Sequence, residues 1–289
     1  MNPTLERPVV VYVPAYNCER FVVATLEEIP PEIWAFSEVV VVDNCSTDRT
    51  VETIQEANRD GRFPRKVHVV RTPQNTGYSG SQKMVYKLVL ANPAVQWVVM
   101  LHGDGQYPPE LLPDMILSTR KDAMVVYGHR DRSEFPKKEE TPFIAYVVIR
   151  LLSAIESLVT GYPRREWHSG FVMYHRDFLA KVNLDALTTT PHIDGHLLFA
   201  AGVLGVRVRG LPIFKRYKGY EAFGGLERLW YIVNVFALLF RFRMEGGDNL
   251  ILRGTQALPE CEVVDGPEAG TADPSASSEA FVTFTGTSP

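Results

Sequence analysis

The chain has 289 residues, a formal net charge of -4, and 45% hydrophobic and 22% charged residues. This balance is that of an ordinary soluble domain, and the lack of a basic surplus argues against a DNA or RNA partner. Three cysteines without paired metal spacing, Cys18, Cys45 and Cys261, indicate reduced thiols and a cytoplasmic location.

In the N-terminal half, short β-branched runs alternate with amphipathic stretches. The predicted strands are Val9 to Val13, Glu38 to Val42, Val67 to Arg71 and Trp97 to Leu101, and the predicted helices are Glu19 to Glu28, Arg49 to Asn58 and Tyr78 to Leu90. Such alternation is typical of an α/β fold with a mostly parallel central sheet and helices on both faces.

The pattern changes after the fourth strand. The further predicted elements are a strand Ala123 to Gly128, an apolar helix Phe143 to Val159, a strand around Phe171 to Tyr174, a helix around His196 to Val203 and a strand at residues 206–210. We expect residues 1–253 to form one domain. Residues 254–289 are rich in Gly, Ser, Thr, Pro and acids without periodicity, and are predicted to be a disordered tail.

The N-terminus shows no basic segment followed by a long apolar stretch, so we expect no signal peptide. Two apolar segments, Phe143 to Val159 and Leu229 to Arg243, fall short of the roughly 20 apolar residues that span a bilayer. The first is also interrupted by Arg150 and Glu156. Neither segment is therefore expected to cross a membrane.

Polar residues follow each of the first four predicted strands, where an open parallel sheet binds its ligands. The fourth strand is followed by Asp104 between Gly103 and Gly105, and then by Gln106. A hard divalent cation takes oxygen ligands, and glycines let a diphosphate approach the backbone. The segment therefore predicts a metal and diphosphate site; the alternative is that Asp104 caps the helix that follows.

Asp43 ends the second predicted strand and is followed by small polar residues. Its carboxylate can accept a hydrogen bond from a ring N–H of a base. The alternative is that it closes a turn with Ser46 and Thr47. We favour base recognition.

Six polar segments occur along the chain. They are PAYN (Pro14 to Asn17), VVVDNCSTDRT (Val40 to Thr50), NTGYSGS (Asn75 to Ser81), HGDGQYPPE (His102 to Glu110), WHSGFVMYHR (Trp167 to Arg176) and KRYKG (Lys215 to Gly219). In this order they resemble the motifs of family 2 glycosyltransferases of the GT-A fold, in particular the dolichol-phosphate mannose synthase-like branch. The resemblance covers about residues 8 to 243 and implies a hexosyltransferase with a nucleotide-sugar-binding fold.

The resemblance also implies roles for single residues. Those implied to bind the nucleotide sugar are Pro14, Tyr16, Glu19, Asp43, Gly103, Arg130 and Arg216, the two arginines at the phosphates. Asp104 matches the last aspartate of the family's DxD metal motif, and Gln106 the glutamine that often joins it. The implied cofactor is a divalent metal, Mn²⁺ or Mg²⁺. Asp194 lies near the position of the acidic residue that faces the acceptor in related enzymes.

One motif departs from the family pattern, because the DxD positions read His102-Gly103-Asp104. A neutral imidazole can bind manganese, though it suits magnesium less well. Either His102 is a metal ligand or it only packs beside the nucleotide. In the acceptor region, next to Ser169, His168 is either a second imidazole near the metal or a hydrogen-bonded residue that positions the loop, which we favour.

The implied reaction is an inverting, in-line transfer of a single sugar from a nucleoside diphosphate, with UDP favoured and GDP as the alternative. A metal on Asp104 and the cations Arg130 and Arg216 would stabilise the leaving diphosphate. Asp194 is the candidate general base for a hydroxyl acceptor, unless it only caps the following helix.

The acceptor is either a polyprenyl phosphate or a soluble small molecule. The apolar segments can lie in a membrane interface, on the inner face of the membrane, or they can bury against the sheet or form a homodimer contact. The third hypothesis is a catalytically inactive nucleotide-sugar-binding protein, which the departure at His102 keeps open.

Overall fold

The computed structural model describes residues 6–217, 225–253 and 262–264. The strands are β1 (Val9–Ala15), β2 (Ser37–Asp43), β3 (His68–Arg71), β4 (Trp97–Met100), β5 (Val125–Arg130), β6 (Val172–His175), β7 (Val208–Ile213) and β8 (Glu262–Val263). The α-helices are α1 (Val22–Glu27), α2 (Pro31–Phe36), α3 (Thr50–Arg59), α4 (Gly77–Ala91), α5 (Leu112–Leu117), α6 (Phe143–Thr160), α7 (Arg176–Leu179), α8 (Ile193–Val203) and α9 (Gly225–Glu245). Short 3-10 helices lie at Pro109–Leu111, Ser118–Lys121, Leu184–Ala186 and Asp248–Leu250.

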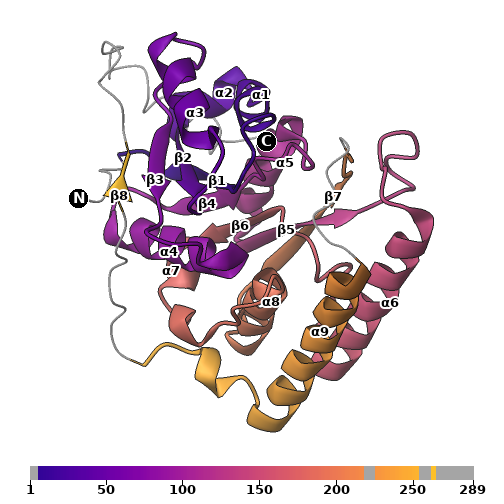
Figure 1. Cartoon of the computed structure of the whole chain (residues 1–289). Helices are drawn as coiled ribbons and strands as arrows, with labels where there is room; N and C mark the ends of the chain where they lie inside the picture. Colours follow the sequence, from indigo (N-terminus) through magenta and orange to yellow (C-terminus); the bar gives the residue numbers. More distant parts are fainter. Residues whose placement is uncertain (1–5, 218–224, 254–261, 265–289) are drawn as a thin grey trace, which may run out of the picture.

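The described strands form one sheet in the order β7-β5-β6-β4-β1-β2-β3-β8. β3, β2, β1 and β4 run parallel, as do β5 and β7, whereas β6 is antiparallel to both β4 and β5. Helices cover both faces of this sheet (Figure 1). The mostly parallel α/β fold expected from the sequence is confirmed.

The two faces of the sheet explain why its strands are so uniformly apolar. Along β1, Val10 and Tyr12 belong to one buried cluster, and Val9, Val11 and Val13 to the other. Successive side chains of a strand point to opposite faces, so a strand covered on both sides must be apolar at every position. The first cluster is completed mainly by α4, α8 and α9, and the second by α1, α2, α3 and α5.

The parallel register brings the ends of the first four strands to one edge. Beyond their ends, Asn44 N–H donates to Ala15 O (2.8 Å), Thr72 N–H to Asp43 O (3.0 Å) and Leu101 N–H to Tyr12 O (2.8 Å). The polar loops after β1, β2, β3 and β4 therefore lie beside one another. This is the edge at which the sequence predicts ligand binding.

Two helices differ from the sequence prediction. Helix α2 was not predicted; it begins at Pro31, because a proline at the first helical position loses no intrahelical hydrogen bond. Helix α8 begins at Ile193 rather than near His196. Asp194 consequently lies in the first turn of α8, where a carboxylate interacts favourably with the helix dipole.

The predicted tail contains a strand among its described residues. β8 pairs antiparallel with β3 through Val70–Val263 and Arg71–Glu262, and Gln55 Nε2 donates to Val264 O at 2.9 Å. The prediction of disorder is wrong for these three residues, because β3 would otherwise be an edge strand with free backbone groups. The rest of residues 254–289 lies outside the described part.

Helices α6 and α9 lie side by side and expose much of their apolar surface (Figure 1). Of the 18 residues of α6, Leu152, Ser153 and Glu156 are buried, and Leu158 on α6 and Leu226 on α9 are 84% and 85% exposed. Within the described residues, α6 is the one helix whose length and composition would allow it to cross a membrane, a test that the sequence analysis expected it to fail.

Candidate active site

The loops after β1 and β2 hold each other in place. Asn17 N–H donates to Ser46 Oγ, and Thr47 N–H donates to Asn17 Oδ1, both at 2.9 Å. Asn17 and Cys45 have φ angles of 49° and 62°, in the left-handed region. Cross-loop hydrogen bonds of this kind offset the cost of such backbone conformations and fix one wall of the site.

Of the predicted nucleoside residues, Pro14 lies on β1 and Tyr16 is 46% exposed just beyond it. Asp43 is fully buried; its carboxylate accepts from Ser46 N–H at 3.3 and 3.2 Å and lies 3.3 Å from Arg71 Nε. The turn predicted as the alternative role of Asp43 is therefore present. Glu19 accepts a hydrogen bond from the backbone N–H of Arg49 at 2.8 Å, so its carboxylate binds the backbone just before α3.

Asp104 stands on a tight turn beside the end of β1. Its Oδ1 accepts from Gln106 N–H at 2.9 Å, and Gly105 has a φ of 69°. A Cβ on Gly103 would lie 3.2 Å from Pro14 O, so a larger residue there would press on β1. The two glycines thus let the chain present Asp104 close to the first strand.

His102 is an uncharged imidazole in this setting. Burial lowers its pKa to about 4, and although Asp104 raises the pKa, Lys215 lowers it further. The ring lies between those of Tyr78 and Tyr107, with centroid distances of 5.6 and 4.9 Å, and Nε2 is 3.3 Å from Tyr78 Oη. A neutral imidazole, a carboxylate and an amide form a donor set that suits Mn²⁺, so the residues fit the predicted metal.

Lys215, rather than Arg216, faces this group. Burial lowers the pKa of Lys215 to about 8, and Arg130 lowers it further while Asp104 raises it. The Lys215 ammonium lies 5.0 Å from the Tyr107 ring centroid. Arg216 instead pairs with Glu28 (3.1 Å) and Glu110 at the surface. Successive side chains of an extended segment point to opposite sides, so Lys215 and Arg216 have different surroundings.

Arg130, predicted at the phosphates, is buried and already paired. Its Nη2 lies 2.9 Å from Glu166 Oε1 and donates to His168 O at 3.1 Å, and its N–H donates to Glu166 Oε2 at 2.7 Å. Next to His168, Ser169 is buried, and Gly170 N–H donates to Tyr107 Oη at 2.9 Å. Arg130 therefore positions the loop at 166–170 and supplies buried positive charge near Lys215.

Asp194, the candidate base, is buried in the first turn of α8. Its carboxylate accepts from Tyr78 Oη (3.0 Å), Gln82 Nε2 (3.3 Å) and Tyr174 Oη (3.2 Å). Burial raises its pKa to about 6, although these three donors each lower it. Among the described residues, the Tyr78 hydroxyl links it to His102. This position fits a positioning residue better than direct contact with an acceptor.

A second group of ionisable side chains joins α6, the 166–170 loop, the start of α8 and α9. His168 Nε2 is 2.8 Å from Glu156 Oε2, and His192 Nε2 is 2.7 Å from Glu156 Oε1. The two Nδ1 atoms lie 2.8 and 3.0 Å from Tyr231 Oη. Burial raises the pKa of Glu156, but the two imidazoles lower it to about 2. We call Glu156, His168 and His192 the His–Glu cluster.

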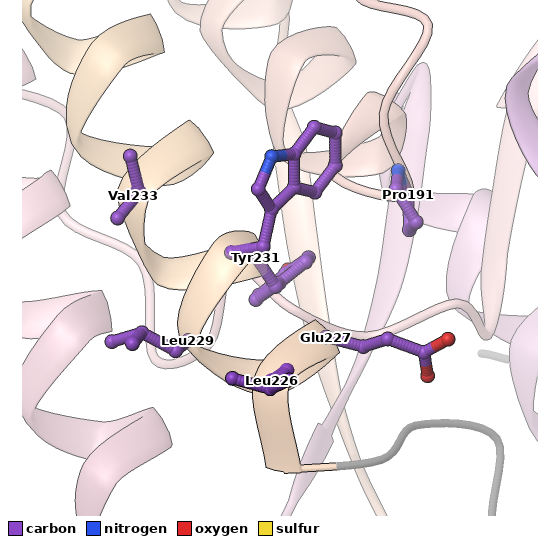
Figure 2. A pocket seen from close by; sticks show the side chains of 7 residues that line it. Pro191, Leu226, Glu227, Leu229, Tyr231 and Val233 are labelled. Carbon is purple, nitrogen blue, oxygen red and sulfur yellow. The ribbon is translucent and has the colours of Figure 1, made fainter.

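An apolar cavity of about 640 Å³ opens beside Tyr231 (Figure 2). Its lining residues are Pro191, Leu226, Glu227, Leu229, Trp230, Tyr231 and Val233. Tyr231 thus belongs both to the wall of this cavity and to the surroundings of the His–Glu cluster. The cavity opens on the same helix that carries the exposed apolar face.

Comparison with known proteins decides the family. The family model described as glycosyl transferase family 2 matches residues 10–182, more than half of the chain. The chain belongs to glycosyltransferase family 2. As a member of this family it is an enzyme with the GT-A fold, as the motifs predicted.

Individual relatives agree with this assignment. A dolichol-phosphate mannosyltransferase of Pyrococcus furiosus is 28% identical over 121 residues, which are 42% of this chain and 32% of that protein. The match therefore spans about a third of the relative's length. Glucosyl-3-phosphoglycerate synthase of Mycobacterium tuberculosis, solved with Mn²⁺, UDP and phosphoglyceric acid, covers 82% of this chain and 78% of its own at 16% identity and a TM-score of 0.59. The same enzyme with UDP covers 81% and 79% at 19% identity, with a TM-score of 0.57. At these identities the likeness establishes a shared fold.

In this glycosyltransferase the residues read from the motifs after β1 and β4 come together, whereas several residues near them were assigned no role by any motif. The structure gathers Pro14, His102, Gly103, Asp104 and Gln106 at one edge of the sheet. The residues to which no motif assigned a role are Lys215 and Glu166, near Asp104 and Arg130, and Glu156, His192 and Tyr231, at the His–Glu cluster. One signal was available: Glu156 interrupts an apolar helix, and a buried carboxylate requires a partner.

Proposed function

We propose that this enzyme transfers a single sugar, with inversion, from a nucleoside diphosphate sugar to a polyprenyl phosphate. The favoured nucleotide is UDP, with GDP as the alternative. The observation that supports a lipid acceptor is the exposed apolar face of α6 and α9. This face opens into the cavity at Tyr231, beside the loop at 166–170, which we call the acceptor loop. The proposal makes the enzyme a peripheral protein of the inner membrane face.

On the donor side, Tyr16 and Asp43 would hold the nucleoside, and Asp104, His102 and Gln106 would hold Mn²⁺ or Mg²⁺. When bound, the divalent ion neutralises negative charge that grows on the leaving diphosphate. Lys215 supplies a second positive charge to the same group, and its partial burial strengthens that interaction. The paired Arg130 holds the loop that borders this site.

On the acceptor side, a phosphate nucleophile is already an anion and needs no general base. This fits the burial of Asp194, whose oxygens accept from three side-chain donors. Exposed apolar residues on two adjacent helices would lie in the lipid and deliver the phosphate to the loop at 166–170. The name of the Pyrococcus relative, a dolichol-phosphate mannosyltransferase, agrees with a lipid-phosphate acceptor.

A soluble phosphorylated acceptor is the second candidate. The observation in its favour is the fold shared with a synthase that was solved with phosphoglyceric acid. In that case the apolar face would be covered in another way, for example by a second copy of the chain. The two acceptors share a phosphate group, so the hydrophobic surface distinguishes them.

The test measures transfer from UDP- and GDP-sugars, with Mn²⁺, to a polyprenyl phosphate in vesicles and to phosphoglycerate in solution. Leu151→Glu and Trp230→Glu place a charge on the apolar face, and Leu117→Glu, at the 37% exposed last residue of α5, is the control away from that face. We expect vesicle binding and lipid transfer to fall about tenfold or more in the first two variants only.

Equal transfer by all four proteins to the lipid, or transfer to phosphoglycerate alone, would overturn the lipid acceptor. Calorimetric titration of UDP and GDP with and without Mn²⁺ identifies the base separately. Nucleotide binding without transfer to any acceptor would support the inactive binding protein instead. Light scattering in the absence of vesicles shows whether a homodimer covers the face.

A further inference from the structure

The His–Glu cluster joins three parts of the chain that are far apart in sequence. Glu156 lies on α6, His168 in the acceptor loop and His192 at the start of α8. All three side chains are at least 96% buried. One ligand atom from each residue lies within 4.8 Å of the others. The cluster shares no residue with His102, Asp104 and Gln106.

The polar atoms at the centre of the cluster face one another. Both carboxylate oxygens of Glu156 and both Nε2 atoms are buried and have no hydrogen-bond partner among the described residues. Each Nε2 nevertheless lies within 2.8 Å of a carboxylate oxygen. Four buried polar atoms without partners are costly unless something positive lies between them.

The outer side of each imidazole indicates which tautomer it adopts. Tyr231 Oη lies within hydrogen-bond distance of both Nδ1 atoms, at 2.8 and 3.0 Å. One hydroxyl oxygen has two lone pairs and can accept from two Nδ1–H groups. In that arrangement both Nε2 lone pairs face the Glu156 carboxylate. A ligating histidine commonly has its other ring nitrogen fixed in this way.

We propose that Glu156, His168 and His192 bind a divalent first-row transition metal ion, with zinc as the first ion to test. Two imidazole nitrogens and a carboxylate suit zinc and its neighbours, and leave room for a further ligand. A cation between these atoms would satisfy all four partnerless groups at once. This site is separate from the metal at Asp104 and does not depend on the proposed function.

The ion would tie the acceptor loop to the apolar helices. Glu156 lies on α6, Tyr231 on α9, and His168 O accepts from Arg130 Nη2 at 3.1 Å. A metal at this point fixes α6, the loop and the start of α8 together, with α9 held through Tyr231. The expected consequence is a metal-dependent stability of the acceptor side.

The first experiment measures metal content by mass spectrometry in protein from cells supplied with zinc, manganese, iron and cobalt. We expect one tightly held ion per chain in the wild type. Glu156→Gln and His192→Asn should lower that content about tenfold or more. His175→Asn, at a half-buried histidine outside the cluster, is the matched control, and Asp104→Asn removes the donor-side ligand; both should keep the ion.

The second experiment uses only the wild-type chain, so it does not depend on variants that fold. Zn²⁺ is returned to chelator-treated protein without nucleotide, and thermal unfolding is followed. At about 1,000 times the dissociation constant the midpoint should rise by about 10 °C. Co²⁺ in place of Zn²⁺ should give the visible absorption of a nitrogen- and oxygen-ligated ion.

A chain without metal before and after exposure to Zn²⁺ and Co²⁺ would overturn the proposal, and would leave the cluster as a contact between Glu156 and two imidazoles. Metal that stays in His192→Asn but leaves Asp104→Asn would overturn it equally, by assigning the ion to the donor side. Metal content and thermal unfolding can both be measured in a protein that transfers no sugar. The metal site and the proposed function are therefore tested independently.

Discussion

The donor edge and the acceptor side of this enzyme are built in different ways. At the donor edge, the loops after β1, β2 and β4 are joined by backbone hydrogen bonds and short side-chain contacts. On the acceptor side, buried ionisable side chains from α6, the 166–170 loop, α8 and α9 meet in the interior. The first part depends on local turns, and the second on how distant elements pack.

The two regions differ in how easily their ligand specificity can change. A loop held by backbone contacts tolerates few changes of conformation, so its ligand chemistry is fixed by residues such as Asp104. In a site formed by helices that pack on a sheet, a substitution or shift in any one helix can change the residues that line the site. The two relatives described above differ in the phosphorylated molecule that their names mention, dolichol phosphate in one and phosphoglyceric acid in the other. The predictions below test whether catalysis depends on the donor edge and stability on the acceptor side.

The largest effect is expected from Asp104→Asn. The amide can still accept from Gln106 N–H, so the turn should persist, but the charge that attracts the metal is lost. We expect kcat/KM to fall about 1,000-fold with an unchanged unfolding midpoint. Steady-state transfer assays across Mn²⁺ concentrations measure this. Activity within threefold of wild type would place the metal elsewhere.

The next effect compares neighbours, Lys215→Met and Arg216→Met. The Lys215 ammonium lies at the Tyr107 ring near Asp104, whereas Arg216 pairs with Glu28 and Glu110 at the surface. We expect about a 100-fold loss of kcat/KM for Lys215→Met, because a charge facing the diphosphate is removed. Arg216→Met should cost less than about threefold, since surface ion pairs contribute little. A larger loss for Arg216→Met than for Lys215→Met would support the phosphate-binding role that the motif implied for Arg216.

Much of the fold could be predicted from sequence because burial on both faces of a parallel sheet forces continuous apolar runs, as in β1 and β2. Asp104 was found because its glycine neighbours and strand end are local features. The ion pair of Arg130 with Glu166 and the meeting of Glu156 with His192 were not found, because they join residues 36 positions apart. No local pattern encodes such contacts, and only the packing of α6 against the sheet creates them.

The pH dependence gives a smaller effect with a definite sign. Lys215, with a pKa lowered to about 8 mainly by burial, is charged below that pH and loses its charge above it. We expect kcat/KM to fall about tenfold per pH unit on the alkaline side. Lys215→Arg, which stays charged, should lose this limb of the profile.

Stability should change in the opposite direction over the same window. The folded pKa is below the ordinary 10.5, so the unfolded chain binds more protons between about pH 8 and 10.5. The contribution of Lys215 to stability therefore rises with pH while activity falls. Denaturant titrations at several pH values separate loss of charge from unfolding. A parallel fall of both quantities would contradict the assignment.

The smallest effect is expected where the two regions touch, at Tyr78. Its hydroxyl donates to Asp194 Oδ2 (3.0 Å) and lies 3.3 Å from His102 Nε2. Tyr78→Phe removes both contacts, but Gln82 Nε2 still donates to the same carboxylate oxygen at 3.3 Å. We expect a loss of about 1 to 2 kcal/mol in the free energy of unfolding. Tyr86→Phe, which removes a buried hydroxyl bonded to Gln82 Oε1, is the matched control.

The stability loss in Tyr78→Phe should depend on pH, in a direction set by the ionisation of Asp194. The pKa of Asp194, raised to about 6 mainly by burial, is above its ordinary 3.8, so the folded state favours the protonated acid. Removing a donor to the carboxylate raises the pKa further, and the ionised form then costs more stability above pH 6. The difference between Tyr78→Phe and wild type should therefore grow as the pH rises through 6, whereas that of Tyr86→Phe should change less. Nucleotide binding in the presence of Mn²⁺ is measured for both variants. If it weakens in Tyr78→Phe only, the Tyr78 hydroxyl couples Asp194 to the donor edge through His102. Equal nucleotide binding in both variants would mean that the two regions act independently.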